Sequence, residues 1–336
     1  MTFEELLRGL PRQTSTEWAA RAEREWRGRP GAAFAKTFGR GAGGVEVAVG
    51  PFVTTDPTRP PVPTRPPVPR PSRPRWVPMS DLRPLGDALT AEDALAELAG
   101  GAQGLCLDAA QLPRLAGSGG AIRYDYLALE LHGADGDTEL RLREVVPEEQ
   151  RAGTDITYVP ASDATHPGGE GPTRRAVALP VGESAAATAT AAAEAFERGG
   201  ADALAVALPT DYLAAVALLG ALDLLWDRAA AARGASPAPL HLSAHVAPTG
   251  AVDTPEAYLV DASVRALAAV SAGVDALVVT PFSGAPAHRR QARNLPQLLL
   301  LEAGFAERPD VLAGAAWFEE AAGALARAAW ASPPTP

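Results

Sequence analysis

The side chains best suited to chemistry in this chain follow short apolar runs. Histidine, acidic and threonine side chains at the ends of these runs are natural candidates for catalytic chemistry. If the runs are parallel strands of a barrel, their carboxyl ends meet at one rim, where catalytic groups gather. The strand-end candidates are Asp108, His132, the Thr210–Asp211 pair, His245 and Thr280.

His245 is the candidate catalytic residue, and its own strand supplies neighbours. The period of two along 240–245 places His241, Ser243 and His245 on one face. The two histidines are about 13 Å apart along an extended strand, too far to share a metal ion. Because no other His, Cys, Asp or Glu grouping has ligand spacing, the sequence predicts no metal site. His245 is either functional or a hydrogen-bonded structural residue.

Alternating strands and helices must position these residues. The expected strands are 104–108, 126–132, 176–180, 203–208, 240–245 and 276–280. The expected helices are 91–99, 184–198, 212–233, 255–271 and 287–303, with an amphipathic C-terminal helix after them. This repeated pattern favours a (β/α)8 TIM-barrel-like α/β fold. The interval 140–171 is polar and rich in Gly and Pro, so we expect one barrel unit to be shortened there.

The segments before and after the barrel have different compositions. We expect a helical N-terminal arm over 1–55, a Pro/Arg-rich linker over 56–78, the barrel over 79–331 and a tail over 332–336. The linker must be extended, because proline fixes φ and removes a hydrogen-bond donor. It is either a semi-rigid strap, which we favour, or a PxxP ligand for an SH3-like module.

Composition and charge exclude several classes of partner. The net charge of −10 argues against nucleic-acid and anionic-membrane partners. No apolar run is long enough to span a bilayer, and the N-terminus lacks a signal-peptide pattern. Cys106, the lone cysteine, cannot form an internal disulfide, so a cytoplasmic location is expected.

The C-terminal third carries a series of motifs in a fixed order. The motif positions are 266–269, Gly273, Asp275, Ala276, Pro281 and Phe282, then Arg290, Arg293, Asn294, Gln297 and Glu302, and finally Asp310, Gly314, Trp317, Phe318, Glu319, Ala329 and Trp330. In this order and spacing the segment resembles the part that closes the barrel in acyl-CoA mutases of the methylmalonyl-CoA mutase family. The resemblance is strong over 203–330, moderate at the arm and the start of the barrel, and poor over 140–182.

The resemblance implies a function for the whole chain. The chain most resembles the small, non-catalytic subunit, without the C-terminal cobalamin-binding domain. It implies a heterodimer with a large catalytic subunit that isomerises an acyl-CoA of the methylmalonyl-CoA/succinyl-CoA type. We expect adenosylcobalamin in that partner chain and no cofactor bound by this chain alone.

The same resemblance implies a set of candidate site residues and one alternative function. His245 matches the histidine of the family's R.HS segment, but Ser243 replaces its arginine. The candidate substrate-binding residues are Ser243, Arg290, Arg293 and Asn294, although an Arg pair at i and i+3 more often bridges carboxylates. The alternative is an active mutase barrel that works with a separate cobalamin-binding chain and uses His245 as donor to the thioester. A barrel lyase or aldolase is a third class, and the lack of lysine after Lys36 excludes its Schiff-base form within the barrel.

Overall fold

The computed structural model describes most of the chain. The described residues are 15–25, 35–40, 46–50, 76–118, 120–160, 173–180, 184–199, 201–234, 239–250, 252–305, 311–312 and 315–330. Most of the predicted linker (56–75), the first part of the arm and the tail therefore lie outside the described residues. So does His166.

Eight parallel strands form a closed barrel in the order β10-β3-β4-β5-β6-β7-β8-β9. The strands are β3 (Val77–Asp81), β4 (Gly104–Asp108), β5 (Ala128–Ala134), β6 (Asp155–Pro160), β7 (Thr173–Leu179), β8 (Ala203–Ala207), β9 (His241–Val246) and β10 (Ala276–Val279). Most of them are short and largely buried, as expected for strands covered by helices on the outside and packed side chains on the inside. The predicted (β/α)8 barrel is confirmed.

Helices follow most strands and cover the outside of the barrel. They are α3 (Ala91–Ala99), α4 (Thr138–Val145), α5 (Glu148–Arg151), α6 (Ala185–Arg198), α7 (Tyr212–Ala232), α8 (Pro255–Ser271), α9 (Pro286–Gln297) and α10 (Ala316–Trp330). Polar N-caps start several of them: the side chains of Thr90, Ser184, Asp211 and Thr254 each accept a backbone N–H of the first turn. Shorter turns are η3 (Arg83–Ala88), η4 (Ala109–Ser118), η5 (Tyr124–Tyr126) and the π-helical η6 (Leu298–Glu302).

Two barrel strands, β3 and β6, were missing from the sequence-based prediction, and so were β1 (Lys36–Arg40) and β2 (Glu46–Val49) in the arm, which was expected to be helical. The barrel begins with β3 and not with α3, so the predicted boundary at residue 79 falls inside a strand. The expectation that 140–171 is too irregular for a complete unit is wrong, because α4, α5 and β6 lie there. Both barrel strands contain proline and polar residues, which concealed their apolar pattern.

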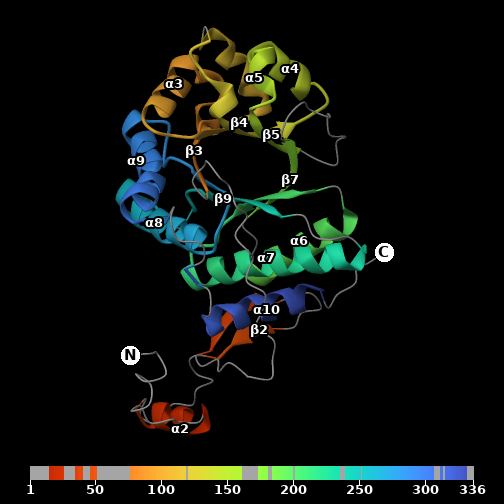
Figure 1. Cartoon of the computed structure of the whole chain (residues 1–336). Coiled ribbons are helices and arrows are strands. Elements are labelled where there is room, and N and C mark those ends of the chain that lie inside the picture. The colour runs from red at the N-terminus through yellow and green to blue at the C-terminus, as the bar shows by residue number, and fades with distance from the viewer. Residues whose placement is uncertain are drawn as a thin grey trace, which may run out of the picture.

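An antiparallel hairpin from the arm covers part of the outer helical layer. It consists of β1 (Lys36–Arg40) and β2 (Glu46–Val49), and it follows α2 (Ser15–Glu25) in the chain. Figure 1 shows β2 beside α10, with α7 on the other side of that helix. Phe38, Val47 and Val49 are buried in the same core as α6, α7 and α10.

The apolar core has two large parts. One spans 82–158 and belongs to the N-terminal half of the barrel, while the other joins the C-terminal half to the hairpin. Smaller clusters fill the inside of the barrel, among them Val77, Met79, Cys106, Ala276 and Val278. Among the described helices, none combines the length and apolar character that a bilayer crossing requires.

Candidate functional site

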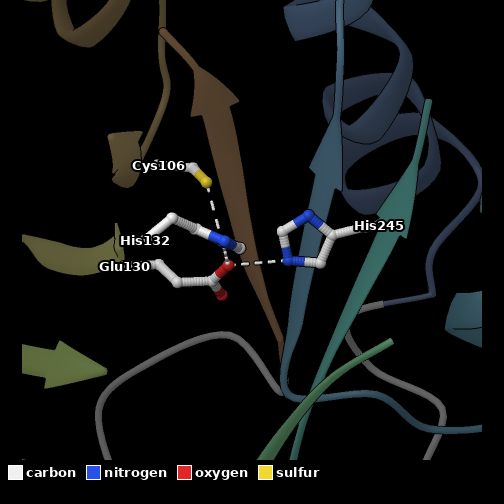
Figure 2. Close-up of side chains that lie close together, drawn as sticks. All are labelled: Cys106, Glu130, His132 and His245. Carbon is white, nitrogen blue, oxygen red and sulfur yellow. Dashed lines mark hydrogen bonds and ion pairs between the residues drawn. The ribbon is translucent and has the colours of Figure 1, made fainter. Parts of the chain in front are cut away.

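Alternation along three strands brings the candidate residues into the barrel. Cys106 on β4, Glu130 on β5 and Ser243 on β9 are buried on the inner face. His132 and His245 lie two residues further along β5 and β9, so they point to the same side one layer higher. Figure 2 shows Cys106, Glu130, His132 and His245 converging inside the barrel.

The Glu130 carboxylate is the centre of this group. Its Oε1 lies 2.6 Å from Nε2 of His132 and 2.6 Å from Nε2 of His245. The Cys106 thiol donates to the same oxygen at 3.7 Å, and Ser243 Oγ donates to Oε2. Since Glu130 is only 1% exposed, these protein donors replace the water that a carboxylate would otherwise bind.

A second buried carboxylate lies beside the first group. Asp81 accepts two hydrogen bonds from the Arg83 side chain, at 2.8 and 2.7 Å, and one from Thr280 Oγ1 at 2.6 Å. Arg83 Nη2 is also 3.3 Å from Nδ1 of His245. A guanidinium can only donate, so this contact makes Nδ1 an acceptor and places the His245 proton on Nε2, facing Glu130.

The protonation states follow from burial and these contacts. Burial works to raise the pKa of Glu130, but His245 and the hydrogen bond from His132 outweigh it and hold that pKa well below its usual value. Arg83 likewise keeps the pKa of Asp81 low against the effect of burial. Burial lowers the pKa of His132 and raises that of the Cys106 thiol well above its ordinary value. At neutral pH the site therefore holds two carboxylates, one guanidinium, a neutral His132 and a thiol.

The Glu130 contacts cross the whole barrel. In the ring of strands β5 and β9 are four positions apart in either direction, which makes them diametrically opposite. The bonds from Ser243 and His245 to Glu130 therefore run across the axis, and not between neighbouring strands. A buried polar bridge of this kind closes the axis at that level.

The structure separates the predicted site residues into two groups. It places Ser243 and His245 together, with Ser243 Oγ 3.4 Å from His245 Nε2. Arg293 lies in the helical layer, where it pairs with the buried Glu97 at 3.1 Å. Arg290 and Asn294 are exposed on α9, so these three residues do not join the barrel site.

The strand-end candidates also divide. His132 and Thr280 belong to the polar network described above. Asp211 instead caps α7 and pairs with Lys36 of the hairpin at 2.5 Å. Asp108 is the last residue of β4, where its backbone N–H donates to the Gln111 side chain.

Sequence reasoning missed Glu130, Asp81, Arg83 and the role of Cys106. A signal for two of them was present, because Glu130 and Cys106 stand two residues before the strand-end candidates His132 and Asp108. The search for ligand spacing within one strand did not find the group Cys106, Glu130, His132 and His245, whose ligand atoms all lie within 4.8 Å of one another. Three separate strands supply them.

Comparisons with known proteins give only distant likenesses. No family model matches the chain, and no curated protein matches it. A solved dihydropteroate synthase (FolP) from Thermus thermophilus is 16% identical, with a TM-score of 0.39 over 69% of this chain and 94% of that one. Rhizobium etli pyruvate carboxylase T882A is also 16% identical, with a TM-score of 0.32 over 81% of this chain and 31% of that one. Likenesses at this level say nothing about the activity of this chain.

Proposed function

We propose that this chain is a small, non-catalytic barrel subunit that supports a larger, cobalamin-dependent chain in isomerising an acyl-CoA. The motifs over 266–330 support the family, and the filled barrel axis supports the non-catalytic role. In this proposal adenosylcobalamin and the methylmalonyl-CoA or succinyl-CoA substrate are held by the partner in a heterodimer. The contribution of this chain is structural.

The polar bridge across the axis is the observation that carries the proposal. A barrel that isomerises an acyl-CoA along its axis has to admit the thioester and its long pantetheine arm. Here Glu130, bonded to Ser243 and His245 of the opposite strand, occupies that path. Opening it would leave a buried carboxylate without its donors, at a cost of about 3–5 kcal/mol.

The state of His245 supports the same conclusion. A histidine that polarises a thioester carbonyl must present a free N–H to the substrate. The Nε2–H of His245 is directed at Glu130, and its Nδ1 accepts from Arg83. Both ring nitrogens are therefore occupied by neighbours in the protein.

The first test is to purify the tagged full chain from its native lysate and identify its partner by mass spectrometry. The proposal expects a cobalamin-dependent mutase large chain. Recovery of a small cobalamin-binding chain alone would instead favour an active barrel using His245. A chain that purifies without any mutase component would contradict both.

The second test measures isomerisation by the assembled complex carrying His245→Gln, which keeps an N–H donor in the network. The proposal expects kcat within about twofold of wild type, since the reaction takes place in the partner. A loss of about 10²-fold or more, the usual effect of removing a catalytic proton donor, would move the chemistry to this chain. Circular dichroism and recovery of the complex control for folding and assembly.

A further inference from the structure

Four side chains in the barrel offer a compact set of metal ligands. Cys106 Sγ, a Glu130 oxygen and one ring nitrogen each from His132 and His245 all lie within 4.8 Å of one another. Thiolate, imidazole and carboxylate are the ligands that Zn²⁺ uses in four-coordinate sites. We propose that these four side chains bind one zinc ion. This proposal does not depend on the proposed role in an acyl-CoA mutase.

The distances require only small side-chain movements. Around a tetrahedral zinc with bonds of about 2.0–2.3 Å, ligand atoms lie roughly 3.3–3.8 Å apart. Cys106 Sγ and Glu130 Oε1 are already 3.7 Å apart. The two contacts of 2.6 Å between histidine Nε2 atoms and Glu130 Oε1 would lengthen by about 0.7 Å or more as the ion takes the place of the shared hydrogens.

The charges of the described network leave a place for a cation. Asp81 is neutralised by Arg83, with which it shares two side-chain hydrogen bonds. The Glu130 carboxylate is bonded to the His132 and His245 rings, the Cys106 thiol and the Ser243 hydroxyl, and among the described residues no arginine or lysine forms an ion pair with it. A divalent ion bound by the Glu130 carboxylate and the Cys106 thiolate would leave the site neutral.

Residues around the four ligands are arranged to hold them. Ser243 donates to Oε2 of Glu130, which fixes the carboxylate and leaves Oε1 directed at the other three ligands. Zinc on Nε2 of His245 moves the ring proton to Nδ1, so Arg83 has to turn its Nη2 away from that nitrogen. The bond from Arg83 Nε to Asp81 Oδ1 does not involve that nitrogen, so it can keep the side chain in place during this change.

The ligand set indicates a structural role for the ion. Four protein ligands complete the tetrahedral coordination of zinc and leave no open position for water or substrate. They come from β4, β5 and the diametrically opposite β9. One ion would therefore tie both halves of the barrel together across its axis.

Cobalt substitution of the full-length protein tests the site directly. Protein freed of metal by dialysis against a chelator is titrated with Co²⁺ and followed by absorption spectroscopy. We expect one equivalent to bind, with a thiolate-to-cobalt charge-transfer band in the near ultraviolet and the strong visible bands of tetrahedral Co²⁺. Zinc should displace the cobalt and raise the Tm of the protein.

Two variants connect the signal to these ligands. Cys106→Ser keeps the size and buried position of the side chain, and it should abolish the charge-transfer band. His288→Ala removes a histidine from the first turn of α9, where its Nδ1 contacts Ser283 Oγ, and should leave the titration unchanged. No binding by the wild type, binding without the charge-transfer band, or a band that survives Cys106→Ser would each overturn the proposal. Circular dichroism of each variant shows whether it is folded.

Discussion

At the residue scale, the buried ion pair of Asp81 and Arg83 depends on both members. Asp81 accepts hydrogen bonds from the side chains of Arg83 and Thr280, and its own side chain is 1% exposed. A buried guanidinium that loses its carboxylate costs far more than an exposed one, because water cannot replace the partner. This pair also holds the arginine that determines the tautomer of His245.

Asp81→Asn removes the charge while keeping the shape. We expect it to lower the free energy of unfolding by about 2–3 kcal/mol, because the Arg83 side chain, which is 23% exposed, loses the carboxylate with which it is paired. Urea denaturation measures the change. Asp87→Asn is the matched control, since Asp87 pairs with Arg114 in full contact with water and should change stability by less than about 0.5 kcal/mol. Equal effects of the two substitutions would show that burial of the pair does not matter.

His241 should make stability sensitive to mild acid. Burial lowers its pKa below the ordinary value near 6.5, and nearby charges modify this effect. These charges belong to Asp275, Arg174, Asp155 and Glu130. Below about pH 6.5 His241 is protonated in the unfolded chain. In the folded chain it stays neutral until the pH reaches its lower folded-state pKa. Stability is therefore full above that pH and is lost as the pH falls.

His241→Asn removes this titration. We expect its unfolding free energy to fall less steeply than that of wild type between about pH 7 and 5, with a difference of roughly 1 kcal/mol over the interval. Chemical denaturation at several pH values gives the slope, which is separate from any constant loss of stability. His288→Asn controls for the loss of a histidine outside the barrel. Parallel pH profiles for wild type and His241→Asn would contradict the prediction.

The candidate site was only partly predictable from sequence. Alternation along one strand was sufficient to place Ser243 beside His245 on an inner face. Alternation also places Glu130 on the same face as His132, but its contacts with Ser243 and His245 could not be found in this way, because these residues are 113 and 115 positions away on the opposite strand of the ring. Local periodicity determines which face a residue occupies, but only closure of the barrel determines what it meets there.

At the element scale, strongly patterned segments were predictable and mixed ones were not. The strand Gly104–Asp108 and the helices Ala91–Ala99 and Pro255–Ser271 have the predicted bounds, since caps and glycines mark their ends. The strands β3 and β6 were not predicted. A strand that is buried on both faces shows no alternation of polar and apolar residues, and both of these strands also contain proline. The hairpin β1–β2 is a tertiary feature, since it packs on α6 and α10.

The contact between this hairpin and α6 is close enough to test with one methyl group. Gly39 has a φ of +92°, and a Cβ at this position would lie 2.3 Å from Cβ of Ser184, the N-cap of α6. We expect Gly39→Ala to lower stability by about 2–3 kcal/mol, through both backbone strain and overpacking. Thermal unfolding measures this. Gly50→Ala is the control from the same hairpin, because a Cβ there meets nothing within 4 Å. Equal Tm values for the two variants would contradict the prediction.

At the scale of the whole molecule, the barrel and the hairpin share one apolar core. Phe38, Val47 and Val49 belong to the same buried cluster as α6, α7 and α10. Figure 1 shows the hairpin as an outer layer on α10. A barrel without the hairpin would expose an apolar surface that large side chains normally cover.

Truncation tests this dependence. A chain starting at residue 76 loses the hairpin, and we expect it to bind the dye ANS and to lose at least about 3–5 kcal/mol, the usual cost of removing one buried Phe. A chain starting at residue 35 keeps β1 and β2 and is the matched control. Both are followed by thermal unfolding and dye fluorescence. If the shorter chain is as stable as the control, the hairpin is not part of the core.

The bridge from Glu130 to the opposite strand also bears on the order of folding. Each half of the barrel has its own apolar core, built largely from contacts within that half, whereas Glu130 meets Ser243 only after both halves have come together. Contacts of such long sequence separation form late. We expect Ser243→Ala to speed unfolding while leaving the folding rate nearly unchanged, which stopped-flow chevron measurements can show. The bridge would then act as a latch, setting how long the finished barrel stays closed and not how quickly it forms.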